Sequence, residues 1–164
     1  MKRLVALALA AGLIVSLGAC ASGDKAMPQR SGAATPVAAI PAKPVDPASL
    51  YARLGQRPGI EAVMTEFVAR MAKDRRVGKR FANTDAKALI AKLTDQLCEG
   101  TGGPCKYAGK DMKAAHAGMK IANAEWNVTV AHMMGSMRAK KVGRKEQQEV
   151  RTALGTMRKD IVGQ

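Results

Sequence analysis

Five side chains in this 164-residue sequence are the leading candidates for chemistry. They are two histidines, one lysine and two cysteines: His116, His132, Lys92, Cys98 and Cys105. The sequence has no nucleophile elbow, no phosphate-binding glycine loop followed by lysine, and no paired Cys-x-x-Cys motifs. Zinc ligands with suitable spacing are also missing. The candidates therefore point to metal ligation by a single side chain or to disulfide formation.

The two histidines lie in different sequence contexts. His132 stands between Ala131 and Met133 within a predicted long helix, where a structural role is favoured. His116 lies on a short predicted helix, between a glycine-rich segment and the helix-breaking Gly118. This context holds His116 away from regular helix packing, but single histidines are mostly structural. From context alone, a ligand role and a structural role both stay open for His116.

The elements that must position these residues are helices. After Pro47, good helix formers dominate and the alternation of a strand is missing. We predict helices over 48–54, 58–72, 85–98, 111–117, 123–140 and 144–162. Pro58 suits a first helical position, and Thr84 or Asp85 suits a helix cap. Residues 99–110 contain four glycines and one proline, so they cannot form a continuous helix.

The N-terminal part has the pattern of an export signal and a linker. Lys2 and Arg3 precede an apolar run over residues 4–17, which is too short to span a bilayer comfortably. The run ends in Leu-Gly-Ala-Cys20, which resembles the bacterial lipoprotein box. We expect an export signal over 1–20, a proline- and alanine-rich linker over 21–47, and a folded domain over 48–164. The protein would be a membrane-anchored envelope lipoprotein facing the periplasm. Cleavage at Ala19-Cys20-Ala21 would instead make it a soluble periplasmic protein.

The charge of the chain is strongly positive. Lysine and arginine number 27 against 13 aspartate and glutamate residues, a formal net charge of +14. This excess favours anionic partners such as phospholipid head groups and carboxylate-bearing ligands. Aromatic residues make up only 3% of the chain, and the basic residues are scattered. Together with the export signal, these features argue against nucleic acid as a partner.

An ordered series of motifs surrounds His116. The series is Leu50-Tyr51-Ala52-Arg53-Leu54-Gly55, Asp74-Arg75-Arg76-Val77, Arg80-Phe81-Ala82-Asn83-Thr84-Asp85, residues 102–112, and Ala115-His116-Ala117-Gly118-Met119. Over about 49–161, this series closely resembles the group one truncated haemoglobins. The resemblance implies an all-α, two-over-two helical sandwich that encloses haem b. It also implies a monomer that reversibly binds oxygen or nitric oxide and relies on an unidentified reductase.

The resemblance assigns roles around the haem. His116 matches the proximal iron ligand, and Phe81 matches the aromatic residue that packs flat on the porphyrin. Tyr107, Met119 and Trp126 fall where side chains line the pocket. Haem is a large apolar disc with two propionates, so it needs an apolar slot with basic residues at its rim. The apolar residues of the predicted helices could form such a slot, which would also be the core of the domain.

The sequence departs from the family on the other side of the haem. The family often holds bound oxygen with a tyrosine and a glutamine, whereas the matching positions here are Val68, Leu89 and Leu93. Without hydrogen-bond donors, oxygen should leave faster and the iron should oxidise more readily. Some relatives supply a second iron ligand at the position of Lys92. Two interpretations stay open for Lys92: iron ligation after desolvation of its amine, or contact with a propionate or solvent.

Cys98 and Cys105 bracket residues 99–104. Outside the cytoplasm a disulfide is chemically favoured, and lipidation of Cys20 would leave these two as the remaining thiols. A bridge across this short loop would contribute about 2 kcal/mol in the entropic model. The alternative is a buried Cys98 thiol with Cys105 left free.

Three functions follow from these observations. The first is a gas-binding haem protein, with nitric oxide or peroxide chemistry as a secondary activity, rather than a dedicated enzyme. The second is an electron-transfer or redox-sensing protein with six-coordinate iron through Lys92. The third, from a different class, is a haem-free helical envelope lipoprotein that acts as a binding module.

Overall fold

The computed structural model describes residues 44–164. The expected export signal, Cys20 and most of the expected linker fall in 1–43, outside the described residues. The helices are α1 Leu50–Arg53, α2 Gln56–Lys73, η1 Gly78–Phe81, α3 Ala86–Gly100, α4 Met112–His116, α5 Asn123–Ala139, α6 Arg144–Met157 and η2 Arg158–Asp160, where η marks a 3₁₀-helix. Within this range, an isolated bridge between Ile121 and Val162 is the only β-type pairing. The predicted all-α class is confirmed.

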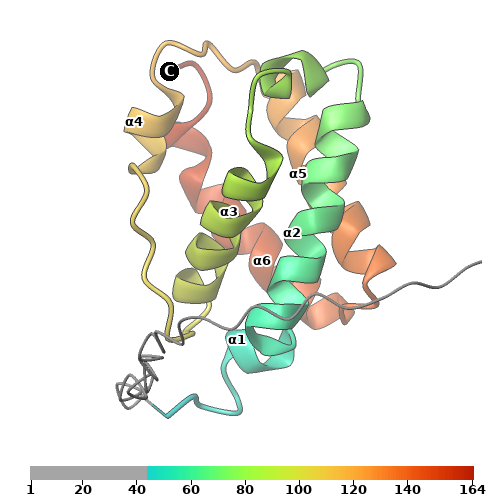
Figure 1. The fold of residues 1–164 in the computed structure, drawn as a ribbon, viewed down its shortest axis with the longest axis vertical. Coiled ribbons are helices and arrows are strands. Elements are labelled where there is room, and N and C mark those ends of the chain that lie inside the picture. Colours follow the sequence, from blue (N-terminus) through green and yellow to red (C-terminus); the bar gives the residue numbers. More distant parts are fainter. Residues whose placement is uncertain (1–43) are drawn as a thin grey trace, which may run out of the picture. The chain divides into compact units, whose positions relative to one another are not determined.

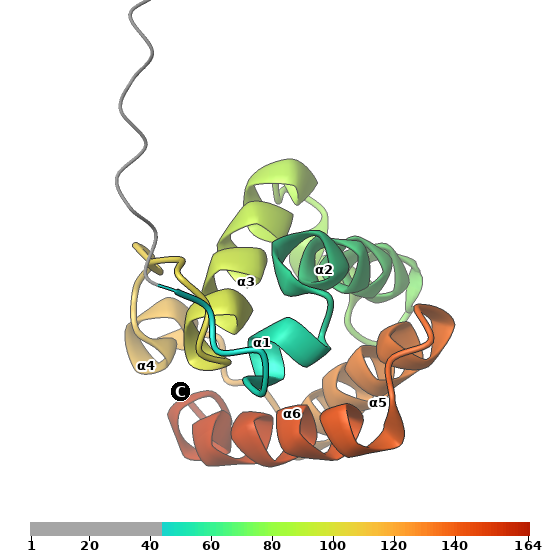
Figure 2. The ribbon, with the colours of Figure 1, turned by 90° about the horizontal axis from the view of Figure 1, so that it is seen from below.

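The long helices form two pairs. Figure 1 shows α2 beside α3, running in opposite directions, and α5 beside α6. Figure 2 looks from below and shows the second pair packed beneath the first, with α2 lying against both α3 and α5. The short α4 lies outside these pairs, near η2 at the C-terminal end of the chain. This arrangement is a two-over-two sandwich, as the motif series implies.

Aspartate caps begin the two helices that frame the glycine-rich segment. Asp85 Oδ1 accepts a hydrogen bond from the backbone N–H of Ala88 at 3.0 Å, so α3 begins at Ala86. Asp111 Oδ1 accepts from the N–H of Ala114 at 2.8 Å, so α4 begins at Met112. Each cap satisfies a backbone donor that has no partner within its helix. The predicted starts of these helices agree with the observed starts to within one residue.

Several predicted boundaries were wrong by two residues or more. Helix α1 begins at Leu50 rather than at 48, and α3 ends at Gly100 rather than at 98. Helix α2 begins at Gln56 rather than at Pro58, because Gly55 adopts a left-handed φ of 83° that turns the chain into the helix. Proline is tolerated anywhere in a first turn, where its missing N–H has no helical acceptor. Helix α6 ends at Met157 rather than at 162. Beyond η2 the chain pairs with the segment after α4, where Gly163 N–H donates to Ile121 O at 3.0 Å.

The core centres on α2 and α5. Six side chains of α2 are buried: Ile60, Val63, Met64, Phe67, Val68 and Met71. The methionines of α5 at 133, 134 and 137 pack in the same cluster. Helix α3 is different, because its apolar stripe is only partly buried and its buried residues are Thr94 and Cys98. None of the helices within 44–164 is both long and apolar enough to cross a membrane.

Candidate functional site

His116 is the last residue of α4, and its side chain is half-buried. Its Nδ1 lies 2.7 Å from the carbonyl oxygen of Met112, one turn earlier. Because a carbonyl only accepts hydrogen bonds, this contact places a proton on Nδ1, and in a neutral imidazole the lone pair is then on Nε2. A hydrogen bond that fixes one ring nitrogen while the other stays available is the usual arrangement of a metal-ligating histidine.

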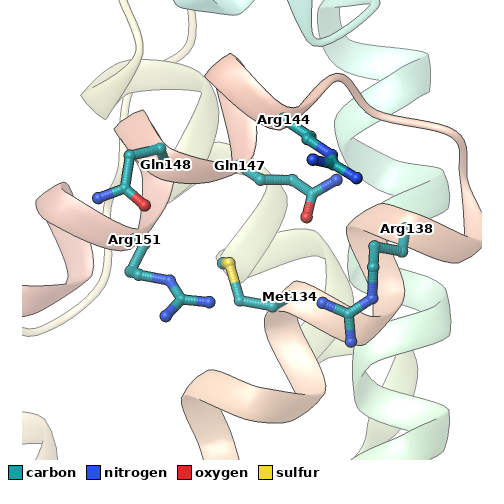
Figure 3. Close-up of a pocket in the computed structure, with 6 residues that line it drawn as sticks. All are labelled: Met134, Arg138, Arg144, Gln147, Gln148 and Arg151. Carbon is teal, nitrogen blue, oxygen red and sulfur yellow. The ribbon is translucent and has the colours of Figure 1, made fainter.

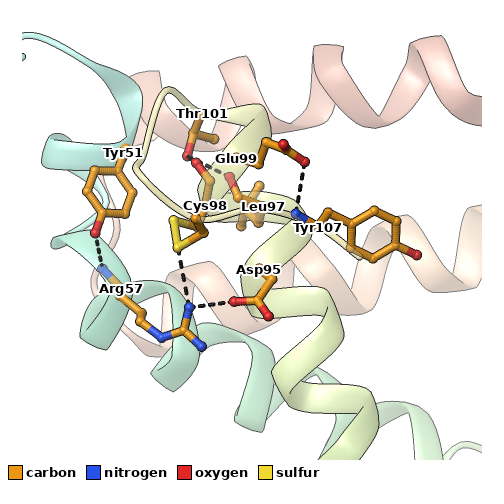
Figure 4. The surroundings of a disulfide bond; sticks show 9 residues. Tyr51, Arg57, Asp95, Leu97, Cys98, Glu99, Thr101 and Tyr107 are labelled. Carbon is orange, nitrogen blue, oxygen red and sulfur yellow. Dashed lines mark hydrogen bonds and ion pairs between the residues drawn. A yellow bond between two sulfur atoms is a disulfide. The ribbon is translucent and has the colours of Figure 1, made fainter. Parts of the chain in front are cut away.

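The segment that leads into α4 is tied to the end of α3. A disulfide joins Cys98 to Cys105, and the carboxylate of Glu99 accepts from the Tyr107 N–H at 3.1 Å. Figure 4 shows these contacts. It also shows Arg57 of α2, whose guanidinium donates to the sulfur of Cys105 at 3.3 Å. The Tyr107 hydroxyl donates to Lys110 O at 2.9 Å. These bonds position a segment that has no helix of its own.

The segment that follows α4 is held by an arginine. Arg80, in η1, donates to the backbone carbonyl of Met119 at 3.0 Å and pairs with Glu125 at 2.6 Å. Glu125 Oε2 also accepts from the N–H of Ala122 at 2.9 Å. Arg80 and the Ala122 N–H together lower the pKa of Glu125 to about 2. These contacts join the elements that carry Phe81, His116 and the start of α5.

The expected pocket residues differ in their exposure. Trp126, in the first turn of α5, is buried, and Phe81 at the end of η1 is half-buried against the core. Tyr107 is also half-buried. Met119 is 46% exposed, so its side chain is not enclosed by protein.

The residues expected on the opposite side come from α2 and α3. Val68 is buried in the core, whereas Leu89 and Leu93 are half-buried on α3. Lys92, on the same helix, is exposed. This placement matches the interpretation in which Lys92 extends toward solvent or a propionate rather than into an apolar slot.

Comparisons with known proteins agree with this geometry. A family model described as bacterial-like globin matches residues 49–162. The group 1 truncated hemoglobin of Tetrahymena pyriformis is 29% identical over 117 residues, covering 71% of this chain and 97% of that protein. One from Nostoc commune is 31% identical over 85 residues, covering 52% of this chain and 72% of that protein. The chain belongs to the group 1 truncated haemoglobins.

A solved structure supports the same assignment for this truncated haemoglobin. The crystal structure of the truncated hemoglobin from Tetrahymena pyriformis in its Fe(III) form superimposes with a TM-score of 0.68 at 28% identity. The match covers 71% of this chain and 99% of that chain. The resemblance drawn from the ordered motifs is confirmed, as is the two-over-two fold. Membership implies haem as cofactor and a gas such as oxygen as ligand.

The residues of this truncated haemoglobin fit a haem group. Porphyrin supplies four nitrogens to its iron, so the protein needs to provide only one imidazole, such as His116 with its available Nε2. The apolar residues of α3 that are only partly covered by protein are suited to contact an apolar disc. They are Leu89, Ile90, Leu93 and Leu97. Within residues 44–164, no three His, Cys, Asp or Glu side chains gather as a metal cluster.

Sequence reasoning about this truncated haemoglobin missed Arg80 and Glu125 as positioning residues. Arg80 lies within the motif series and Glu125 lies shortly after its last motif, but the two residues are 45 positions apart in the sequence. The one local signal was a glutamate at the third position of a predicted helix, which often reaches back to the preceding backbone. Nothing in the sequence paired that glutamate with Arg80.

Proposed function

We propose that this truncated haemoglobin holds haem b through His116 Nε2 and reversibly binds a diatomic gas, oxygen or nitric oxide. The hydrogen bond between His116 Nδ1 and the Met112 carbonyl carries the proposal. It sets the tautomer that iron ligation needs and limits rotation of the ring. When bound, haem would supply the iron that binds a diatomic gas.

The chain's own residues determine how firmly a gas is held. Val68, Leu89 and Leu93 present no hydrogen-bond donor, so they give an apolar wall to the ligand side. Partial negative charge that develops on a bound gas is then not stabilised by the protein. This favours rapid release and easy oxidation over tight storage. Nitric oxide or peroxide chemistry, with an external reductase, is a secondary activity compatible with the same site.

The test is the optical spectrum of the full chain after addition of haem. We expect a Soret band, a ferrous form and a CO-bound form, each depending on His116. In His116→Ala the ferric and ferrous spectra should change, and haem should be lost more readily to an apo-globin acceptor. His132→Ala is the matched control, because it removes the other histidine and should leave the iron spectrum unchanged.

Two results would contradict the proposal. An unchanged iron spectrum in folded His116→Ala protein would mean that another residue is the ligand. Absence of any Soret band with the wild-type chain would favour the haem-free binding module instead. Far-UV circular dichroism of both variants separates loss of a ligand from loss of the fold.

We propose further that Cys20 is lipidated and anchors the domain to the bacterial envelope. The Leu-Gly-Ala-Cys20 motif and the basic composition support this location. One acyl chain binds a membrane only marginally, so several chains or a basic surface would be needed. Mass spectrometry of the mature N-terminus checks the modification, and Cys20→Ala should release the protein from the membrane fraction. An unmodified N-terminus after Ala19 or Ala21 would favour the soluble periplasmic form.

A further inference from the structure

A pocket of about 330 Å³ lies between the end of α5 and the first half of α6. Six residues line it: Met134, Arg138, Arg144, Gln147, Gln148 and Arg151. Figure 3 shows Arg138 and Arg151 on either side of Met134, with Gln147 extending toward the same space. Two helices thus bring three guanidinium groups to one hollow that contains no carboxylate.

The three arginines of this pocket carry uncompensated charge. Within residues 44–164, Arg138, Arg144 and Arg151 take part in no ion pair, although several other arginines do. The nearest carboxylates along α6 are Glu146 and Glu149, and both pair with Arg53 of α1. The pocket therefore gathers positive charge while neighbouring negative charge is neutralised elsewhere.

The pocket is separate from the candidate haem site. Trp126, in the haem region, and Arg138 stand twelve residues apart on α5, which is about 18 Å of helix. Figure 1 shows α4 and the start of α5 in the upper part of the bundle, whereas the pocket is lined by residues near the turn from α5 to α6. The three arginines are consequently not placed to contact the propionates of a haem held by His116.

We propose that this pocket binds a phosphoryl group, either on a soluble molecule or on a phospholipid head group. A phosphate dianion offers several acceptor oxygens in a tetrahedral arrangement, and guanidinium forks donate to such oxygens in pairs. Buried Met134 forms an apolar floor. The pocket is larger than one phosphate ion and can accept part of the attached molecule. The inference stands independently of haem binding.

The test measures binding of inorganic phosphate to the full chain by calorimetry at pH 8 and low ionic strength. We expect saturable binding that Arg138→Gln/Arg151→Gln weakens by about tenfold or more, since it removes charge-assisted hydrogen bonds. Lys73→Gln/Arg75→Gln is the matched control. It removes two exposed basic side chains without ion pairs in the described part of the chain, and it should bind phosphate like the wild type. Circular dichroism checks that both variants fold.

Vesicles of phosphatidylglycerol and phosphatidylcholine distinguish the two sources. A lipid head group is identified as the ligand if two results are found together. The Arg138→Gln/Arg151→Gln variant must lose binding to the vesicles, and inorganic phosphate must displace the wild-type protein from them. Phosphate binding without pocket-dependent vesicle binding identifies a soluble phosphorylated molecule. The proposal is overturned if inorganic phosphate shows no saturable binding. It is also overturned if both double variants lose binding equally, because general surface charge would then explain it.

Discussion

The two histidines of this truncated haemoglobin occupy regions built in opposite ways. His132 lies within the long helix α5, and its Nε2 is 2.7 Å from Asp74 Oδ2 at the end of α2. His116 ends a five-residue helix, and its Nδ1 is satisfied by the carbonyl of Met112. In His132 the Nε2 atom joins two helices, whereas in His116 the hydrogen-bonded atom is Nδ1 and Nε2 has no hydrogen-bond partner in the described part of the chain. The fold thus occupies a different nitrogen in each ring, and only His116 keeps the Nε2 that the proposed ligation requires.

The supports of the two regions differ as well. Asp74 also pairs with Arg76, and the hydrogen bonds from Arg76 and His132 hold the pKa of Asp74 well below its usual range. The His132 region is therefore a charged junction between packed helices. The His116 region depends on connections at its two ends, the disulfide segment before α4 and Arg80 after it. A short helix held at its ends is easier to adjust to a bound cofactor than a helix within the core.

The largest effect should come from opening the disulfide. Cys98→Ser/Cys105→Ser should lower the free energy of unfolding by about 2 kcal/mol, because it releases a short loop in the unfolded chain and unties the lead-in to α4. Amide hydrogen exchange should rise over 101–116 and stay unchanged around His132. Equal loss of protection in both regions would break the comparison, since it would mean that the two regions unfold together.

The next effect concerns His132. His132→Ala should lower the melting temperature of the haem-free protein by a few degrees, because it removes the contact that joins α5 to the end of α2. His116→Ala should change that temperature little, since its hydrogen bond lies within one turn of α4. Thermal denaturation followed by circular dichroism compares them. A larger drop in His116→Ala would mean that His116 is structural.

A pH dependence tests the link between Arg80 and Glu125. The pKa of Glu125 is lowered to about 2 in the folded protein, so its ion pair contributes stability above about pH 4.5 that is lost as pH falls toward 2. Glu125→Gln should therefore reduce the melting temperature at pH 7, and this reduction should shrink steadily as the pH is lowered from about 4.5 toward 2. Glu61→Gln, at an exposed residue of α2, is the control. A difference that stays constant with pH would show that the charge of Glu125 is not involved.

The smallest effect should be that of Lys92. Because Lys92 is exposed on α3, Lys92→Ala should leave the ferric spectrum of the haem-loaded full chain unchanged. Conversion from a six-coordinate low-spin spectrum to a five-coordinate or water-ligated one would establish Lys92 as an iron ligand. That outcome would replace the gas-binding proposal with electron transfer or redox sensing.

Much of the local structure around the candidate site could be predicted because its determinants are local. Asp85 and Asp111 cap helices through hydrogen bonds that reach only three residues. The glycines within residues 100–109 interrupt the helical pattern because of their residue type, whatever the tertiary fold. The bond that orients His116 also lies within one helical turn. The ordered motifs around these elements were therefore enough to identify the family, and they make His116 rather than His132 the predicted ligand.

The sequence by itself determined the helices, their caps and the candidate ligand, since these follow from neighbours a few residues apart. Only the tertiary structure decided which side chains from distant segments meet. It paired His132 with Asp74 and Arg80 with Glu125, and it placed Arg138 and Arg151 around one pocket. It also left Lys92 exposed. Such contacts depend on how helices pack, and packing is set by the whole core rather than by local residue type.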